Sequence, residues 1–103
     1  MGEHNYGPSP MASVVMNLGG DIGALIIEAG AGQLGAEIEI SPAGGGVRTH
    51  SMVRERLTVP DPRYDAVYPD LTAGRYTIWR DAQTPAATVT VHGGQITHHA
   101  WAQ

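Results

Sequence analysis

The chain has 103 residues and a hydrophobic fraction of 42%, enough for one domain with its own core, and its formal net charge of −4 argues against general nucleic-acid binding. Cysteine is absent and all 6 basic residues are arginines, which excludes disulfides, thiolate metal centres, lysine Schiff bases and P-loops.

The N-terminal segment contains neither the basic stretch nor the apolar stretch of a signal peptide. We expect residues 1–12 to be a flexible tail and residues 13–103 to form a single domain. No stretch approaches the ~18 consecutive apolar residues that a membrane-spanning helix requires. We therefore expect a cytoplasmic protein with no membrane span.

Turn-forming clusters of Gly, Pro and Asp recur at a spacing of about 8–12 residues, which is typical of an all-β sandwich. No segment keeps the apolar period of ~3.6 residues that a long helix would show. Residues 13–18 are a candidate edge strand, and residues 30–35 are a candidate for one helical turn. The runs between the turns predict seven main strands, at residues 23–29, 36–40, 47–59, 64–68, 75–80, 87–92 and 95–101.

The longest predicted strand, residues 47–59, alternates between an inner and an outer face. It exceeds the usual length of a strand, so a bulge or bend is expected near Met52–Val53. The expected outer face is a basic stripe that contains Arg48, His50, Met52, Arg54 and Arg56.

The arginines of this stripe have two interpretations. They could bind an acidic partner or a carboxylate ligand, in which case Arg54 and Arg56 belong to an interface. They could instead pair across strands with Glu37 and Glu39 and keep an edge strand soluble.

The last two predicted strands are joined by Gly93-Gly94, which favours a tight hairpin because glycine reaches positive φ without a Cβ clash. In that register Val91 lies opposite Ile96. The hairpin predicts inward positions for Ile96, His98 and Ala100, and outward positions for Thr97, His99 and Trp101.

The segment from Leu71 through Gly74 to Tyr76 resembles the tyrosine corner of Greek-key sandwiches, in which a Tyr hydroxyl bonds back to upstream backbone. With Tyr68 before the corner, residues 22–101 resemble the prealbumin-like sandwich, a plan shared by carboxypeptidase regulatory-like and collagen-adhesin B-type domains. The resemblance implies an antiparallel Greek-key fold of seven to eight strands. It also implies a non-catalytic spacer, binding or accessory domain without a cofactor.

Two relatives of that plan are disfavoured by particular residues. The Lys–Asn isopeptide crosslink of adhesin-type repeats is impossible because the chain has no lysine. The carboxy-terminal Tyr-Arg-Gly-Ser of hydroxyisourate hydrolase is absent, since the chain ends Ala100-Trp-Ala-Gln. The serines have no Gly-x-Ser-x-Gly motif around them. We therefore expect a protein that is not an enzyme.

The tryptophans are the candidate interface residues. If Tyr76 and Ile78 point into the core, Trp79 points outward, and Trp101 shares the predicted outer face of the last strand with His99. Exposed indoles indicate a sugar platform or a protein interface, whereas packing under a loop would make them structural. We expect an interaction or accessory subunit that docks through this face onto a protein partner or a second copy, as a homodimer.

Histidine supplies the alternative function, a small-ligand or transition-metal site. His50, His92 and His99 are candidate ligands, although ordinary surface positions explain them more simply. His98 and His99 point to opposite faces of a strand, so they cannot share one ion without a bulge. An inward His98 could pair with Glu55 in the core, unless a shift of register exposes both.

Overall fold

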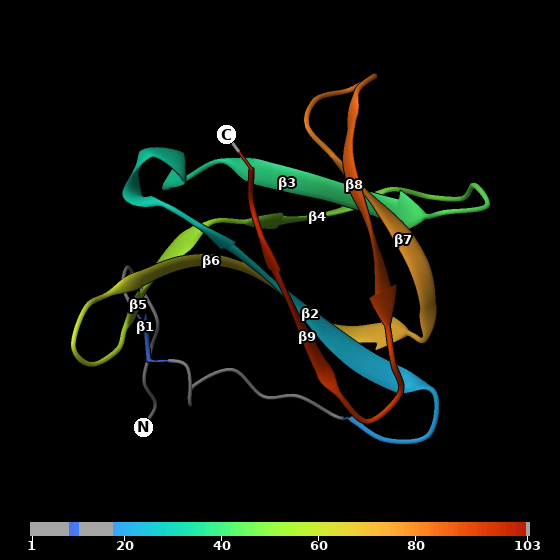
Figure 1. Ribbon diagram of the computed structural model, residues 1–103, viewed down its shortest axis with the longest axis horizontal. Coiled ribbons are helices and arrows are strands. Elements are labelled where there is room, and N and C mark those ends of the chain that lie inside the picture. Colours follow the sequence, from blue (N-terminus) through green and yellow to red (C-terminus); the bar gives the residue numbers. More distant parts are fainter. Residues whose placement is uncertain (1–8, 11–17, 103) are drawn as a thin grey trace.

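The protein is an all-β sandwich, as the sequence predicts (Figure 1). A computed structural model describes residues 9–10 and 18–102. The predicted helical turn is a short 3₁₀ helix, η2 (Ala31–Gln33). The strands are β1 (Ser9–Pro10), β2 (Ile22–Ala29), β3 (Glu37–Pro42), β4 (Thr49–Met52), β5 (Arg54–Leu57), β6 (Arg63–Thr72), β7 (Gly74–Trp79), β8 (Pro85–Val91) and β9 (Ile96–Ala100).

The strands form two sheets. Sheet A has 5 strands in the order β1-β5-β6-β2-β9, and sheet B has 4 in the order β4-β3-β7-β8. Most neighbours are antiparallel, but β9 runs parallel to β2, and β1 runs parallel to β5. The core between the sheets is a cluster of buried residues: Leu25, Ile27, Ile38, Ile40, Val53, Ala66, Tyr68, Tyr76, Ile78 and Val91.

The expected tail lies partly outside the described residues. Ser9–Pro10 pairs with β5, with Ser9 opposite Arg56. The rest of residues 1–12, and residues 13–17 of the candidate edge strand, lie outside the described part of the chain. No helix among the described residues is long and apolar enough to cross a membrane.

The prediction of one strand over residues 47–59 is wrong, although the expected bend is present. At Val53 the chain leaves sheet B for sheet A, so β4 and β5 belong to different sheets. The backbone N–H of Val53 donates to the carbonyl of Ala36 at 2.8 Å, and the N–H of Gly35 donates to the carbonyl of Val53 at 2.9 Å. These two bonds satisfy the backbone at the switch point, and the basic stripe is divided between two sheets.

The predicted hairpin across Gly93-Gly94 is also wrong. This turn carries the chain from sheet B to sheet A, because the carbonyl of Gln95 accepts from the N–H of Ala24 at 3.0 Å. The crossing brings two backbones close together, and a Cβ on Gly93 would lie 2.0 Å from the carbonyl oxygen of Gly20. Consequently the faces of β9 are reversed. Ile96, His98 and Ala100 are the more exposed set, and Trp101 packs against the core.

The predicted corner is present between β6 and β7, which lie in different sheets. The hydroxyl of Tyr76 donates to the carbonyl of Thr72 at 2.6 Å. Gly74 has a φ of 151°, a value that favours glycine, and Leu71 packs against the core. A second tyrosine, Tyr68 of β6, donates to the carbonyl of Ile38 on β3, so it joins the sheets through the core.

Candidate functional site

The outer face of sheet B carries Trp79, but the indole is half-buried instead of freely exposed. Its N–H donates to the hydroxyl of buried Ser41 at 2.9 Å. The Arg48 guanidinium carbon lies 3.7 Å from the centroid of its ring. Trp79 therefore lies against its own sheet under an arginine, which is the structural alternative that the sequence left open.

Arg48 is held by three groups at this position. Its Nη1 donates to Glu39 Oε1 at 2.8 Å, and its Nη2 donates to the carbonyl of Ala82 at 2.8 Å. The third group is the Trp79 ring. The cross-strand pairing expected for the arginines is thus present for Arg48, and His50 similarly lies 3.7 Å from Glu37.

A pocket of about 230 Å³ opens beside Trp79. It lies between β3 and the loop that follows β7. Its lining is formed by Glu37, Glu39, Trp79, Arg80, Asp81 and Ala82.

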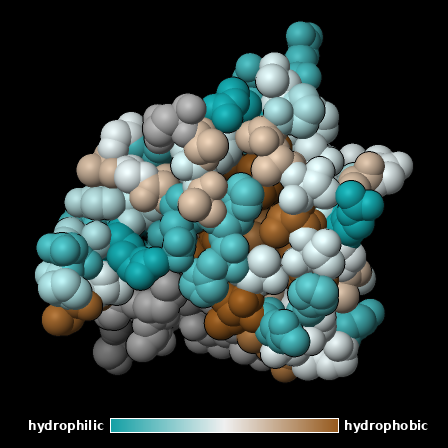
Figure 2. Space-filling view, viewed as in Figure 1, coloured by the Kyte–Doolittle hydropathy of each residue, from teal (hydrophilic) through white to brown (hydrophobic). Residues whose placement is uncertain are grey.

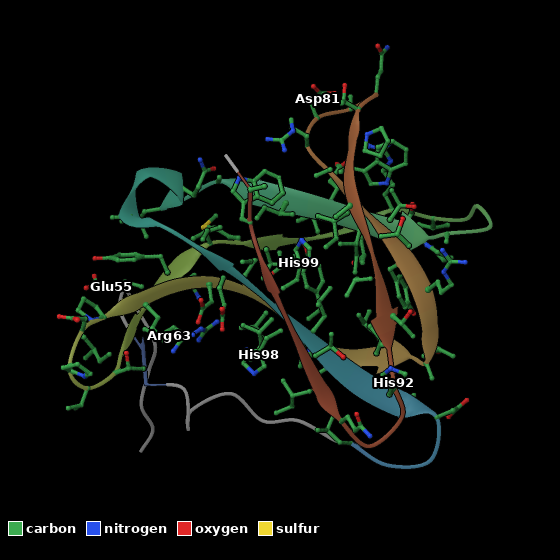
Figure 3. The ribbon with its side chains drawn as sticks, viewed as in Figure 1. Glu55, Arg63, Asp81, His92, His98 and His99 are labelled. Carbon is green, nitrogen blue, oxygen red and sulfur yellow. The ribbon has the colours of Figure 1, made fainter. Side chains whose placement is uncertain are left out.

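The single face expected to contain Trp79, Trp101 and His99 does not form. Trp79 is on the outer face of sheet B, whereas Trp101 follows β9 of sheet A and packs against the core. Arg80 bridges this end of the molecule, with its guanidinium carbon 5.5 Å from the Trp101 ring centroid. His99 is half-buried and points from β9 toward β8, away from His98 (Figure 3). The prediction failed because β9 joined sheet A and reversed its faces.

The three histidines of the expected metal site are not brought together. His50 lies on β4, His92 follows β8, and His99 lies on β9. The described residues contain no group of three or more His, Asp or Glu side chains that could hold a metal ion.

His98 has a partner, but it is Glu28 and not Glu55. Its Nδ1 lies 2.9 Å from Glu28 Oε2, and the same oxygen accepts from Arg63 Nη2 at 2.6 Å. The cluster lies on the outer face of sheet A (Figure 3). Sequence reasoning missed it because Glu28 and His98 meet only through the parallel pairing of β2 with β9.

Arg54 and Arg56, expected at an interface, differ in exposure. Arg54 is exposed, but Arg56 is only 4% exposed and lies opposite Ser9 of β1 on one side and Arg63 of β6 on the other. Nearby Asp65 is 1% exposed, and no described residue donates a hydrogen bond to its carboxylate. Burial raises the pKa of Asp65, while the charges of Arg63 and Arg56 oppose that shift.

The side of the sandwich formed by β8 and β9 is the last candidate surface. Both are edge strands, β8 of sheet B and β9 of sheet A. Figure 2 shows apolar residues, coloured brown, at the surface between the positions of β9 and β8. β8 itself reads Pro-Ala-Ala-Thr-Val-Thr-Val and has no charged side chain.

No protein-family model, no curated protein and no solved structure matches this chain.

Proposed function

We propose that this chain is a non-catalytic, prealbumin-like β-sandwich that acts as an interaction subunit and associates with a second copy of itself through β8. The observation that carries the proposal is the edge position of this uncharged strand of 7 residues, which pairs with β7 on one side and with no described strand on the other. Natural sheets protect exposed edges with charges, prolines, bulges or short strands, because an unprotected edge pairs with other chains. The proline and a register irregularity lie at the start of β8, where Ala87 pairs with Ile78 and Pro85 with Trp79, and residues 87–91 have no charge, proline or irregularity.

The backbone groups available on that edge follow from one hydrogen bond. The hydroxyl of Thr97 on β9 donates to the carbonyl of Thr90 at 3.3 Å, so this carbonyl points away from β7. Outward groups alternate along a regular antiparallel strand, and β8 pairs regularly with β7 from Ala87 to Val91, so the N–H and C=O of Thr88 point the same way. The free edge of sheet B therefore offers Thr88 at its centre.

A second copy suits this edge because the strand carries no charge to repel its equivalent. An antiparallel pair centred on Thr88 would place Thr88 opposite its own counterpart and Ala87 opposite Val89. Threonine pairs across strands are favourable, whereas like charges directly opposite are destabilising. At the other edge of sheet B, β4 has only 4 residues, among them exposed His50, and follows directly on Arg48. That edge is polar and short, so β8 is the better candidate.

The prealbumin-like part of the proposal is supported by the corner. The bond from Tyr76 to Thr72, the packing of Leu71 and the buried Tyr68 agree with the motif that the resemblance implies. Domains of that plan are spacers, binding modules or accessory units, which is the class of function proposed here.

Light scattering on the full chain tests the proposal. The wild type should be a dimer that dissociates on dilution. Thr88→Pro removes an outward N–H from an edge strand, where proline is tolerated, so it should be a folded monomer. Thr88→Val keeps both backbone groups and should remain dimeric. A wild type that is monomeric at every concentration, or a Thr88→Pro dimer as stable as the wild type, would refute the assignment.

A further inference from the structure

The pocket beside Trp79 lies on the outer face of sheet B and is a separate site from the edge of β8. We infer that it is a binding site for the guanidinium group of an arginine presented by a partner polypeptide. The argument rests on what this part of the molecule already holds, on the charges around the pocket, and on its size.

The rim of the pocket already binds a guanidinium. Arg48 contacts the carboxylate of Glu39, the carbonyl of Ala82 and the face of the Trp79 ring. These three residues also line the pocket. A carboxylate, a carbonyl and an aromatic face together satisfy the charge, the donors and the flat surface of a guanidinium. Arg48 already covers the ring face and uses Glu39 Oε1 and the Ala82 carbonyl, so a second guanidinium beside it would reach the other Glu39 oxygen and the carboxylates of Glu37 and Asp81.

The remaining charges of the lining favour a cation. Glu37 is half-exposed, and its ionic neighbour, His50, lies 3.7 Å away. Asp81 Oδ1 accepts the backbone N–H groups of Gln83 and Thr84 at 2.9 and 2.8 Å, and these bonds lower the pKa of Asp81. Asp81 can thus face a ligand as a carboxylate.

Arg80, the cation among the lining residues, binds a different group. Arg80 Nη1 donates to the carbonyl of Ala102 at 3.1 Å, and its guanidinium approaches the Trp101 ring. Three carboxylates line the pocket, those of Glu37, Glu39 and Asp81, and Arg48 pairs with one of them, Glu39.

Size is consistent with the same ligand. The pocket volume of about 230 Å³ is several times the ~30 Å³ that one water molecule occupies in the liquid, so a side-chain head group fits. The pocket is open to the surface, as a group reaching in from a partner chain requires. Free arginine would bring an α-carboxylate toward the acidic rim, so an arginine within a polypeptide is the better match.

Nuclear magnetic resonance on the full chain tests this site, because the two indole N–H signals report separately on Trp79 and Trp101. The probe is the peptide acetyl-Gly-Arg-Gly-amide. We expect the Trp79 signal to shift and saturate while the Trp101 signal stays nearly constant. The same peptide with neutral citrulline in place of arginine should give no saturable shift.

Matched variants separate a site from general attraction to an acidic protein. Glu37→Gln should weaken peptide binding about fivefold, the size of an exposed ion-pair contact of ~1 kcal/mol. Glu55→Gln, which removes a carboxylate from sheet A, should leave it unchanged. Arg48→Gln should strengthen binding by removing the competing guanidinium, whereas Arg54→Gln makes the same change of charge elsewhere and should not.

Three results would overturn the inference. They are equal binding of the citrulline peptide, equal affinity in wild type and Glu37→Gln, and an affinity for free arginine as high as for the peptide. Peptide binding at the pocket does not depend on pairing through β8, so the Thr88→Pro variant should bind the peptide as the wild type does. Loss of self-association and loss of the pocket are therefore distinguishable.

Discussion

The hydroxyl of Tyr76 on β7 reaches back 2.6 Å to the carbonyl of Thr72, the last residue of β6. Because β6 belongs to sheet A and β7 to sheet B, this bond closes the corner where the chain changes sheets. A single connecting residue, Ala73, separates the two strands, and its N–H donates to the carbonyl of Asp21 at 2.7 Å. The corner is therefore held by one side-chain bond and one backbone bond.

Tyr76→Phe tests the corner directly. Loss of one hydroxyl that bonds a backbone carbonyl should lower the free energy of unfolding by about 1 kcal/mol. Tyr64→Phe is the matched control, since Tyr64 packs against the core without a hydroxyl bond to a described residue. Urea unfolding of both variants measures the difference. Equal stabilities would show that the Tyr76 bond contributes nothing.

Tyr68→Phe should cost more than Tyr76→Phe. Tyr68 is buried, and its hydroxyl is the donor to the carbonyl of Ile38 across the core. Ile38 lies opposite Ser51 in the ladder of β3 and β4, so its carbonyl keeps a backbone neighbour. Water cannot replace the lost bond inside the core, so the loss should lie at the upper end of about 0.5–1.5 kcal/mol. Calorimetric unfolding of the two variants gives the ranking, and a smaller loss for Tyr68→Phe would contradict it.

Gly23→Ala tests how closely the two sheets approach at the β8–β9 turn. A Cβ at Gly23 would lie 2.2 Å from the carbonyl oxygen of His92 and 2.9 Å from a methyl of Val91, so the backbones must separate. Overpacking of this kind costs about 1–3 kcal/mol. At Gly32 a Cβ meets nothing within 4 Å, so Gly32→Ala should leave thermal stability nearly unchanged. A loss of equal size in both variants would argue against the close approach.

The buried carboxyl of Asp65 predicts a dependence of stability on pH. Burial raises its folded-state pKa above the ordinary value of 3.8, so the folded protein binds the proton more tightly than the unfolded chain. Its contribution to the free energy of unfolding therefore falls as the pH rises from about 3.8 through the raised pKa. Asp65→Asn removes this contribution.

The stability of Asp65→Asn relative to wild type should therefore increase across that pH range. Urea unfolding at a series of pH values measures the difference between the two proteins. Arg56 and Arg63 lie near Asp65, so the absolute stability of the variant also depends on their charges. The test is therefore how the difference in free energy of unfolding changes with pH. Parallel pH profiles would contradict the prediction.

Local patterns predicted the parts of the fold that short segments determine. The alternation in residues 36–40 and 87–92, the single helical turn and the corner at Tyr76 are all present. Each depends on side chains within a few residues of one another, so the sequence alone contains the signal.

Long-range pairing accounts for what the sequence could not show. Gly93-Gly94 has the composition of a tight hairpin turn, yet it crosses between the sheets because β9 pairs with β2. That pairing reversed the faces of β9 and placed His98 beside Glu28. Similarly, the switch at Val53 depends on backbone bonds to Gly35 and Ala36, which no local pattern reveals.

The candidate sites also divide into features that local patterns indicate and features that depend on long-range pairing. The pairing of Arg48 with Glu39 was an open interpretation of the alternating charges, and it is present. The stacking of Arg48 on Trp79 and the pocket beside it require β3, β7 and the loop after β7 together. The free edge of β8 likewise becomes visible only once the order of strands in sheet B is known.

Hydrogen exchange at the amide of Thr88 tests the central claim most directly, because this N–H points away from β7 on the free edge. If β8 pairs with a second copy, the Thr88 amide should be protected at high protein concentration and lose that protection on dilution, in step with dissociation of the dimer. An amide that exchanges at the unprotected rate at every concentration would contradict the account.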